Sequence, residues 1–149
     1  MRTRHRTDHG AAAVEFALLA PVLVSLIGGL SDYGLSLRCE GLLAGAVASG
    51  AQYAFVVGSS ITATAVMQMV QGSSTLTGIS ATVTGPALYC VSGSPAALVT
   101  AIAGQTCSDG TAPGTYVIIS ATFVYTQLLP QLSTYMNPTL TQTATVRLL

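Results

Sequence analysis

The sequence predicts an α+β protein, in which a long N-terminal transmembrane helix continues into a small exported domain with a second short helix and a roughly three-stranded antiparallel sheet. Three observations predict this class. An apolar run near the N-terminus is long enough to span a bilayer, a helical pattern of small and apolar residues follows it, and three later stretches alternate apolar with polar side chains. The 149 residues leave room for one domain of this kind.

The composition favours a membrane segment joined to an exported domain. Half of the residues are hydrophobic and only 7% are charged, whereas a soluble domain carries about a quarter charged residues. The net charge of zero hides an asymmetry, because the residues up to Gly10 are basic and the rest is slightly acidic. The charged residues are Arg2, Arg4, Arg6 and Asp8 in the first part, and Glu15, Asp32, Arg38, Glu40, Asp109 and Arg147 in the second. No basic patch follows Gly10, so nucleic acid is not an expected partner.

Residues 11–30 form the predicted membrane span. Their only charged residue is Glu15, and about 20 apolar residues cross a bilayer core as a helix that rises about 1.5 Å per residue. Pro21 lies inside the run, and membrane helices tolerate such a proline. Arginines precede the run and acidic residues follow it, so the positive-inside rule places the N-terminus in the cytoplasm and the remaining chain outside.

Three other targeting interpretations are open at this point. A secretory signal needs a small-residue cleavage site close behind the apolar run; Ala46-Val47-Ala48 has that form but lies well downstream. A lipoprotein site at Cys39 is weakened by Arg38, which stands where a small residue is expected. A plain uncleaved anchor is the most serious alternative.

A motif at the start of the span indicates processing. Residues 10–16 read GAAAVEF, a glycine followed by an apolar stretch with glutamate at its fifth position. This motif resembles the cleavage site of type IV pilin-like proteins. More narrowly, residues 10–34, GAAAVEFALLAPVLVSLIGGLSDYG, are similar to the start of the TadE-like family. Its members are minor pilins or pseudopilins of the tight-adherence (Tad) pilus.

The resemblance continues beyond the span. Residues 48–54 look like the family's second helix, although Ser49 and Gln52 replace charged residues that are common there. Residues 58–110 match poorly. The tail, residues 115–149, also looks family-like in Tyr125, in the Leu128-Leu129-Pro130 turn and in the closing strand with Arg147.

The resemblance implies a basic leader at residues 1–10, a transmembrane helix at 11–30 and an exported pilin-like domain at 31–149. It implies a role in pilus assembly and adhesion. The implied partners are a prepilin peptidase, other pilin or pseudopilin subunits, the Tad assembly platform in the inner membrane and a secretion ATPase. The implied place is the bacterial cytoplasmic membrane, with the exported domain outside the cytoplasm or in the pilus.

The motif residues have separate expected roles. Gly10 lacks a side chain, so its peptide can adopt backbone angles that a tight protease site demands. Family-like cleavage frees an amine on Ala11, and a carboxylate inside a membrane needs a partner. We therefore expect Glu15 to pair with the Ala11 amine of a neighbouring subunit. In the alternative, Glu15 satisfies its own helix start or reaches the membrane surface. Phe16 is grouped with Glu15 as an assembly or processing residue.

Beyond the span, the helical pattern continues from Ser31 to about Phe55. Gly41 and Gly45 form a G-x-x-x-G in this part, and small residues one turn apart let two helices approach closely. The partner is either another subunit or this subunit's own sheet. A second short helix is expected at residues 60–71, with Val66, Met67 and Met69 as core residues.

Three stretches alternate as strands do: residues 79–84, 116–125 and 143–148. They predict a small antiparallel sheet with one face on the helices. Turns are expected at Gly85-Pro86, Pro113-Gly114 and Asn137-Pro138.

The chain has three cysteines, Cys39, Cys90 and Cys107. An exported domain can keep disulfides, and we expect one between Cys90 and Cys107, worth about 3 kcal/mol in the chain-entropy model. The alternative is two buried free thiols. Cys39 is then a small packing residue, with an intermolecular bridge as the second interpretation.

The sequence does not favour catalysis. After cleavage at Gly10 the chain has no His or Lys, and its few acids form no evident pair. No serine has a histidine to activate it, and no phosphate-binding or dinucleotide motif is present. We therefore expect no cofactor and no metal site. Two classes remain: a pilin or pseudopilin subunit, and an unprocessed, signal-anchored binding or adhesion module.

Overall fold

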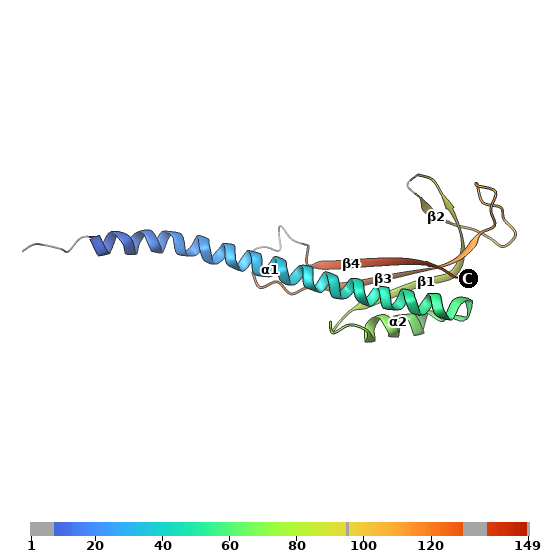
Figure 1. The fold of residues 1–149 in the computed structure, drawn as a ribbon, viewed down its shortest axis with the longest axis horizontal. Coiled ribbons are helices and arrows are strands. Elements are labelled where there is room, and N and C mark those ends of the chain that lie inside the picture. Colours follow the sequence, from blue (N-terminus) through green and yellow to red (C-terminus); the bar gives the residue numbers. More distant parts are fainter. Residues whose placement is uncertain (1–7, 95, 130–136, 149) are drawn as a thin grey trace, which may run out of the picture.

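The computed structural model describes residues 8–94, 96–129 and 137–148. The elements are helix α1 (Asp8–Val57), a 3₁₀ turn (Gly58–Ser60), helix α2 (Ala63–Gly72), and strands β1 (Ser80–Ser92), β2 (Ala97–Thr100), β3 (Gly114–Val124) and β4 (Thr139–Arg147). Figure 1 shows that the N-terminal part of α1 extends alone, while its C-terminal part lies along the sheet beside α2. The predicted α+β class with a long N-terminal helix is confirmed.

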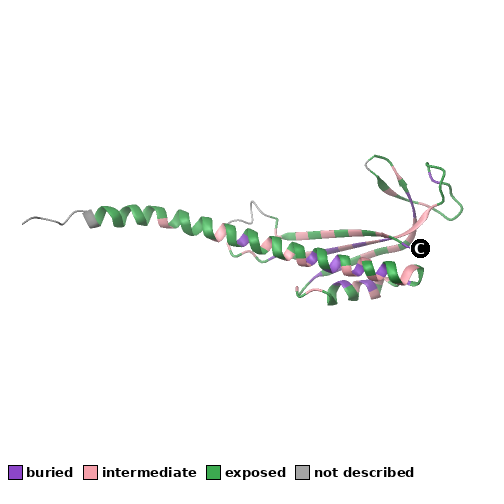
Figure 2. Ribbon diagram, viewed as in Figure 1, coloured by how far each residue is buried: buried purple, intermediate pink, exposed green. Residues whose placement is uncertain are grey.

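Helix α1 is one continuous helix of 50 residues with Pro21 inside it. Its apolar side chains before Gly28 are almost all exposed (Figure 2). The helix is long and apolar enough to cross a membrane, which makes it compatible with a membrane anchor. It ends where Gly58 takes a positive φ of 69°, a conformation that glycine adopts easily.

Helix α2 begins later than the predicted Ser60. Residues 58–60 form the 3₁₀ turn, and the extended Thr62 is the N-cap, whose hydroxyl accepts a hydrogen bond from the Ala65 N–H at 3.4 Å. Val66 and Val70 are buried against the core as a helical period predicts. The prediction for Met69 is wrong, since this side chain is 39% exposed on the outer side of α2.

The sheet is antiparallel throughout, with strand order β2-β1-β3-β4. It has a fourth strand, β2, that the alternation pattern does not reveal, because four residues paired only to β1 are too short to show a period. The turn predicted at Gly85-Pro86 is also wrong. These residues lie inside β1, where the pairing with β3 shifts register between Thr84 and Ala87. A proline is tolerated at such a bulge because it has no N–H to leave unpaired.

One face of the sheet packs against both helices. Helix α2 lies over β1, and α1 lies over β3 and β4 (Figures 1 and 2). The core between these layers is apolar and comprises Leu43, Ala46, Val47, Ala54, Ile61, Val66, Val70, Ile79, Ala81, Val117, Ile119, Ala121 and Leu148.

The opposite face carries hydroxyl groups in rows across the strands. The register aligns Thr82, Ser120 and Thr143 in one row, and Ser80, Thr122 and Thr141 in the next. The hydroxyls of Ser120 and Thr143 lie 3.1 Å apart. These two rows are polar, as the period-two pattern predicts for the solvent side of an antiparallel sheet, and the same face also carries Ile118, Val124 and, at the end of β4, Arg147.

Candidate processing and assembly region

Gly10 and Ala11 lie within the first turns of α1, which begins at Asp8. Both residues are exposed, and no described atom outside the helix backbone would come within 4 Å of a Cβ added to Gly10. The peptide between them is thus helical, and no other described element covers it. A protease that needs an extended substrate has to unwind this end of the helix, and glycine lowers the cost of unwinding by about 1 kcal/mol relative to alanine.

Glu15 and Phe16 lie on the exposed part of α1, where no other described element covers the helix. Glu15 stands four residues after Ala11, which places the two on one side of the helix, about one turn apart. Within the described part of the chain, the Glu15 carboxylate has no hydrogen-bond or ion-pair partner. Arg2, Arg4 and Arg6 of the leader fall outside the described residues.

Gly41 and Gly45 lie on the side of α1 that faces away from the sheet, together with Ala44 and Ala48. We call these four exposed residues the small-residue stripe. Among the described residues, nothing beyond the helix's own backbone lies within 4 Å of a Cβ added to Gly41 or Gly45. The structure therefore does not place the G-x-x-x-G against this subunit's own sheet.

Gly50 shows the contrast. It is buried, and a Cβ added there would lie 2.5 Å from Val70 Cγ2. Helix α1 thus uses Gly50 to approach α2, and leaves the stripe uncovered.

Further along the same helix, an open groove of about 650 Å³ lies between α1 and β4. Its lining is mostly apolar: Ala51, Gln52, Phe55, Val56, Thr145, Val146 and Arg147.

Asp32 is the one buried charged residue of the described chain, and it lies on α1 just beyond the predicted span. Its carboxylate accepts hydrogen bonds from the Tyr125 hydroxyl at 2.5 Å, from the Leu128 N–H at 3.1 Å and from the Leu129 N–H at 3.3 Å. We call this arrangement the Asp32 latch. It fastens the chain that leaves β3 to the helix, beside the point where the apolar run ends.

The Asp32 latch shifts the pKa values of both of its titratable groups, Asp32 and Tyr125. The hydrogen bond from Tyr125, aided by the two backbone N–H groups, lowers the pKa of Asp32 although burial opposes this. The carboxylate of Asp32 and, secondarily, burial raise the pKa of Tyr125 to about 12. Asp32 therefore remains an acceptor, and Tyr125 a donor, over the whole physiological pH range.

Sequence reasoning missed the latch. It used Asp32 only as a marker of the outer end of the span, and Tyr125 only as part of a resemblance. A usable signal was an isolated acid directly after an apolar run, because such a residue needs a partner when the helix packs on a sheet.

Residues 10–52 match the family model of the TadE-like proteins. The N-terminal segment of this chain is TadE-like. The match covers the motif, the span and the small-residue stripe, and it supports a Tad pilus-associated, pilin-like protein. It ends at Gln52, so the expected likeness of the tail lies outside it. No curated protein and no solved structure matches the chain significantly.

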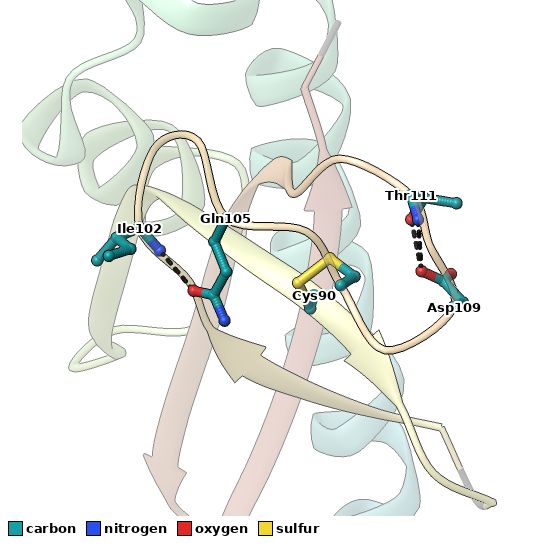
Figure 3. The surroundings of a disulfide bond; sticks show 6 residues. Cys90, Ile102, Gln105, Asp109 and Thr111 are labelled. Atoms are coloured by element: carbon teal, nitrogen blue, oxygen red, sulfur yellow. Dashed lines mark hydrogen bonds between the residues drawn. A yellow bond between two sulfur atoms is a disulfide. The ribbon is translucent and has the colours of Figure 1, made fainter.

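Cys39 is a half-buried free thiol within the TadE-like segment. The other two cysteines lie outside it, at the end of the sheet farthest from the bare part of α1 (Figures 1 and 3). Cys90 of β1 forms a disulfide with Cys107, with Cα atoms 5.5 Å apart. No group of three or more His, Cys, Asp or Glu residues in the described ranges could hold a metal ion.

The loop around Cys107 also has hydrogen bonds of its own. The Asp109 carboxylate accepts from the Thr111 N–H at 3.0 Å, and the Gln105 side chain accepts from the Ile102 N–H at 3.2 Å (Figure 3). The disulfide then ties this loop to β1. The end of the sheet farthest from the exposed part of α1 is therefore fixed covalently, whereas the near end is fixed by the Asp32 latch.

Proposed function

We propose that this protein is a minor pilin or pseudopilin subunit, cleaved by a prepilin peptidase after Gly10, that acts without catalysis in Tad-type pilus assembly and adhesion. The observation that carries the proposal is the TadE-like match over residues 10–52, which starts at the glycine of the cleavage motif. The helix that bears this motif is exposed along its apolar part, as a segment for lipid or for other subunits would be.

The proposed orientation follows from charge. The leader arginines stay in the cytoplasm, α1 crosses the inner membrane, and residues 31–149 lie outside. Cleavage then removes the arginines and leaves a positive amine on Ala11. In this scheme the helix end is freed from its polar leader only after export of the domain.

In this proposal, Glu15 sets the register between neighbouring subunits. An unpaired carboxylate inside a membrane is costly, so it favours any arrangement that brings a cation to it. The Ala11 amine of a neighbouring processed subunit supplies that cation, one helical turn from the neighbour's own Glu15. The small-residue stripe allows close approach of the same two helices farther out, where Gly41 and Gly45 have no side chain in the way.

The unprocessed binding module is the second candidate. The hydroxyl rows on the open face of the sheet favour it, because rows of Ser and Thr hydroxyls can form hydrogen bonds with a glycan or another neutral surface. The same face serves adhesion in the first proposal. Removal of the leader separates the two candidates.

The test of assembly is Glu15→Ala in a strain that lacks the native gene. We expect cleavage at Gly10 to continue and recovery with other pilus subunits to fall, while Glu15→Asp, which keeps the charge, retains part of it. Thr143→Ala on the open sheet face is the matched control for assembly. Unchanged recovery with Glu15→Ala would remove the charge-pairing part of the proposal.

A further inference from the structure

The chain that leaves β3 lies directly on the membrane-proximal part of α1. A Cβ added to Gly28 would come 2.8 Å from Leu129 Cδ1, so the Leu129 side chain rests on the bare helix backbone there. The latch holds it in place, since Asp32 accepts the N–H groups of both Leu128 and Leu129. Figure 1 shows the end of β3 beside the middle of α1, next to the bare part of the helix.

This position has a defined depth if α1 spans the membrane, which is part of the proposed function. Residues 11–30 cover about 30 Å at about 1.5 Å per residue, the thickness of a bilayer's hydrocarbon core. Gly28 precedes the end of that run by two residues, so Leu129 lies about 3 Å inside it. The headgroup region extends about 5–8 Å further on that side. Leu129 and its neighbours are thus level with the outer boundary of the acyl chains.

The segment after β3 exposes apolar side chains that no other described residue covers, although the exposed Thr126 lies between them. Leu128 is 59% exposed, and Val124, at the end of β3, is 64% exposed. The sequence has no charged residue between Asp109 and Arg147. The one acid nearby, Asp32, is fully buried and accepts three hydrogen bonds.

The backbone chemistry also fits a lipid boundary. Polar N–H groups that enter the membrane need partners within the protein. The N–H groups of Leu128 and Leu129 have the Asp32 carboxylate, and that of Tyr125 donates to the Pro138 carbonyl at 2.8 Å. This segment can therefore face acyl chains without an unpaired donor at these three residues.

We propose that Val124, Leu128 and Leu129 form a second membrane contact, immersed at the outer boundary of the bilayer that α1 crosses. The occupant of this surface is the acyl-chain and glycerol region of the phospholipids. The contact would hold the exported domain at a fixed height and tilt, because the segment is joined to the sheet through β3 and to the helix through the latch.

The test places an environment-sensitive fluorophore on single cysteines of the full-length protein. In a Cys39→Ser background, Leu128→Cys is labelled and reconstituted into phosphatidylcholine vesicles with nitroxide lipids of shallow or deep label. Leu23→Cys reports the span, and Ile102→Cys, exposed at the distal end, reports solvent. We expect a blue shift at Leu128→Cys, with stronger loss of emission from shallow than from deep nitroxides.

The remaining outcomes are distinct. Quenching at Leu128→Cys no greater than at Ile102→Cys, with Leu23→Cys strongly quenched, overturns the second contact and leaves the anchor intact. A blue shift without nitroxide quenching also overturns it, since a protein then covers Leu128. If Leu23→Cys itself is not quenched, the anchor of the proposed function fails together with this inference.

Discussion

Tyr125 donates a hydrogen bond to the carboxylate of Asp32, 93 positions earlier in the chain. The bond joins the middle of α1 to the residue that directly follows strand β3. The backbone N–H groups of Leu128 and Leu129 also donate to this carboxylate, so it is buried with hydrogen-bond partners. The sheet is thereby held to the helix by direct hydrogen bonds.

The Asp32 latch predicts that the stability of the fold decreases at both acid and alkaline pH. Asp32 has a lowered pKa in the folded protein, so its contribution is complete above its usual pKa of 3.8 and is lost as the pH falls below that. Tyr125 has a pKa raised from 10.0 to about 12, so its contribution is complete below pH 10.0 and is lost as the pH rises toward 12. We expect a plateau of thermal stability between these limits, measured by circular dichroism.

Tyr125→Phe checks the alkaline limb. We expect the melting temperature at neutral pH to fall by about 5 °C, and the tyrosinate absorbance to lose its step near pH 12. Asp109→Asn is the control for the acid limb, because hydrogen bonds from Thr111 lower the pKa of Asp109 as well. A Tyr125→Phe protein with unchanged melting and titration would show that the latch does not stabilise the fold.

The two kinds of glycine on α1 predict opposite effects of one substitution. Gly45→Ala adds a methyl group in open space and removes a flexible residue, so it should stabilise the helix by about 0.5–1 kcal/mol. Gly50→Ala places a Cβ against Val70 and should destabilise the fold by about 1–3 kcal/mol. Denaturant unfolding of both variants measures this, and equal effects would contradict the assignment of faces.

A large side chain placed in the small-residue stripe tests whether the stripe is a packing surface. Gly45→Leu should leave folding intact, since the site is open, while recovery with partner subunits falls because the helices are kept apart. Met69→Leu, on the outer side of α2, is a control of similar size. Normal recovery with Gly45→Leu would exclude the stripe as a packing surface.

The disulfide predicts a loss of stability at the distal end. Cys90→Ser should lower the free energy of unfolding by about 3 kcal/mol and leave a reactive thiol at Cys107. Thiol labelling under native conditions, with Cys39→Ser as the background, counts the free groups. If both thiols already react in the wild-type protein, the bond does not form in the cell.

Local patterns predicted the elements that have a period of their own. The apolar run and the small residues after it specify α1, and alternation over six or more residues specifies most of β3, the later part of β4 and only the start of β1. The sequence patterns did not predict β2, because Ala97–Thr100 is short and depends on its pairing with β1. Gly85-Pro86 looks like a turn by local rules, but pairing with β3 on both sides of it keeps the strand together.

The residues of the candidate site also fall into two groups: those that a local motif reveals and those that meet only in the fold. Gly10 and Glu15 are close in sequence, so a motif reveals them. Asp32 and Tyr125 meet only because β3 runs back along α1, and no local signal carries a contact over 93 positions. Sequence alone also left the side of the G-x-x-x-G open, and the packing of Gly50 on Val70 shows which side of α1 faces inward.

The most direct test of the central claim is the intact mass of the protein from the membrane fraction, with and without its prepilin peptidase. The account predicts loss of residues 1–10 only when the peptidase is present, which leaves Ala11 as the first residue. A full-length mass in both samples would contradict it and favour the unprocessed, signal-anchored binding module.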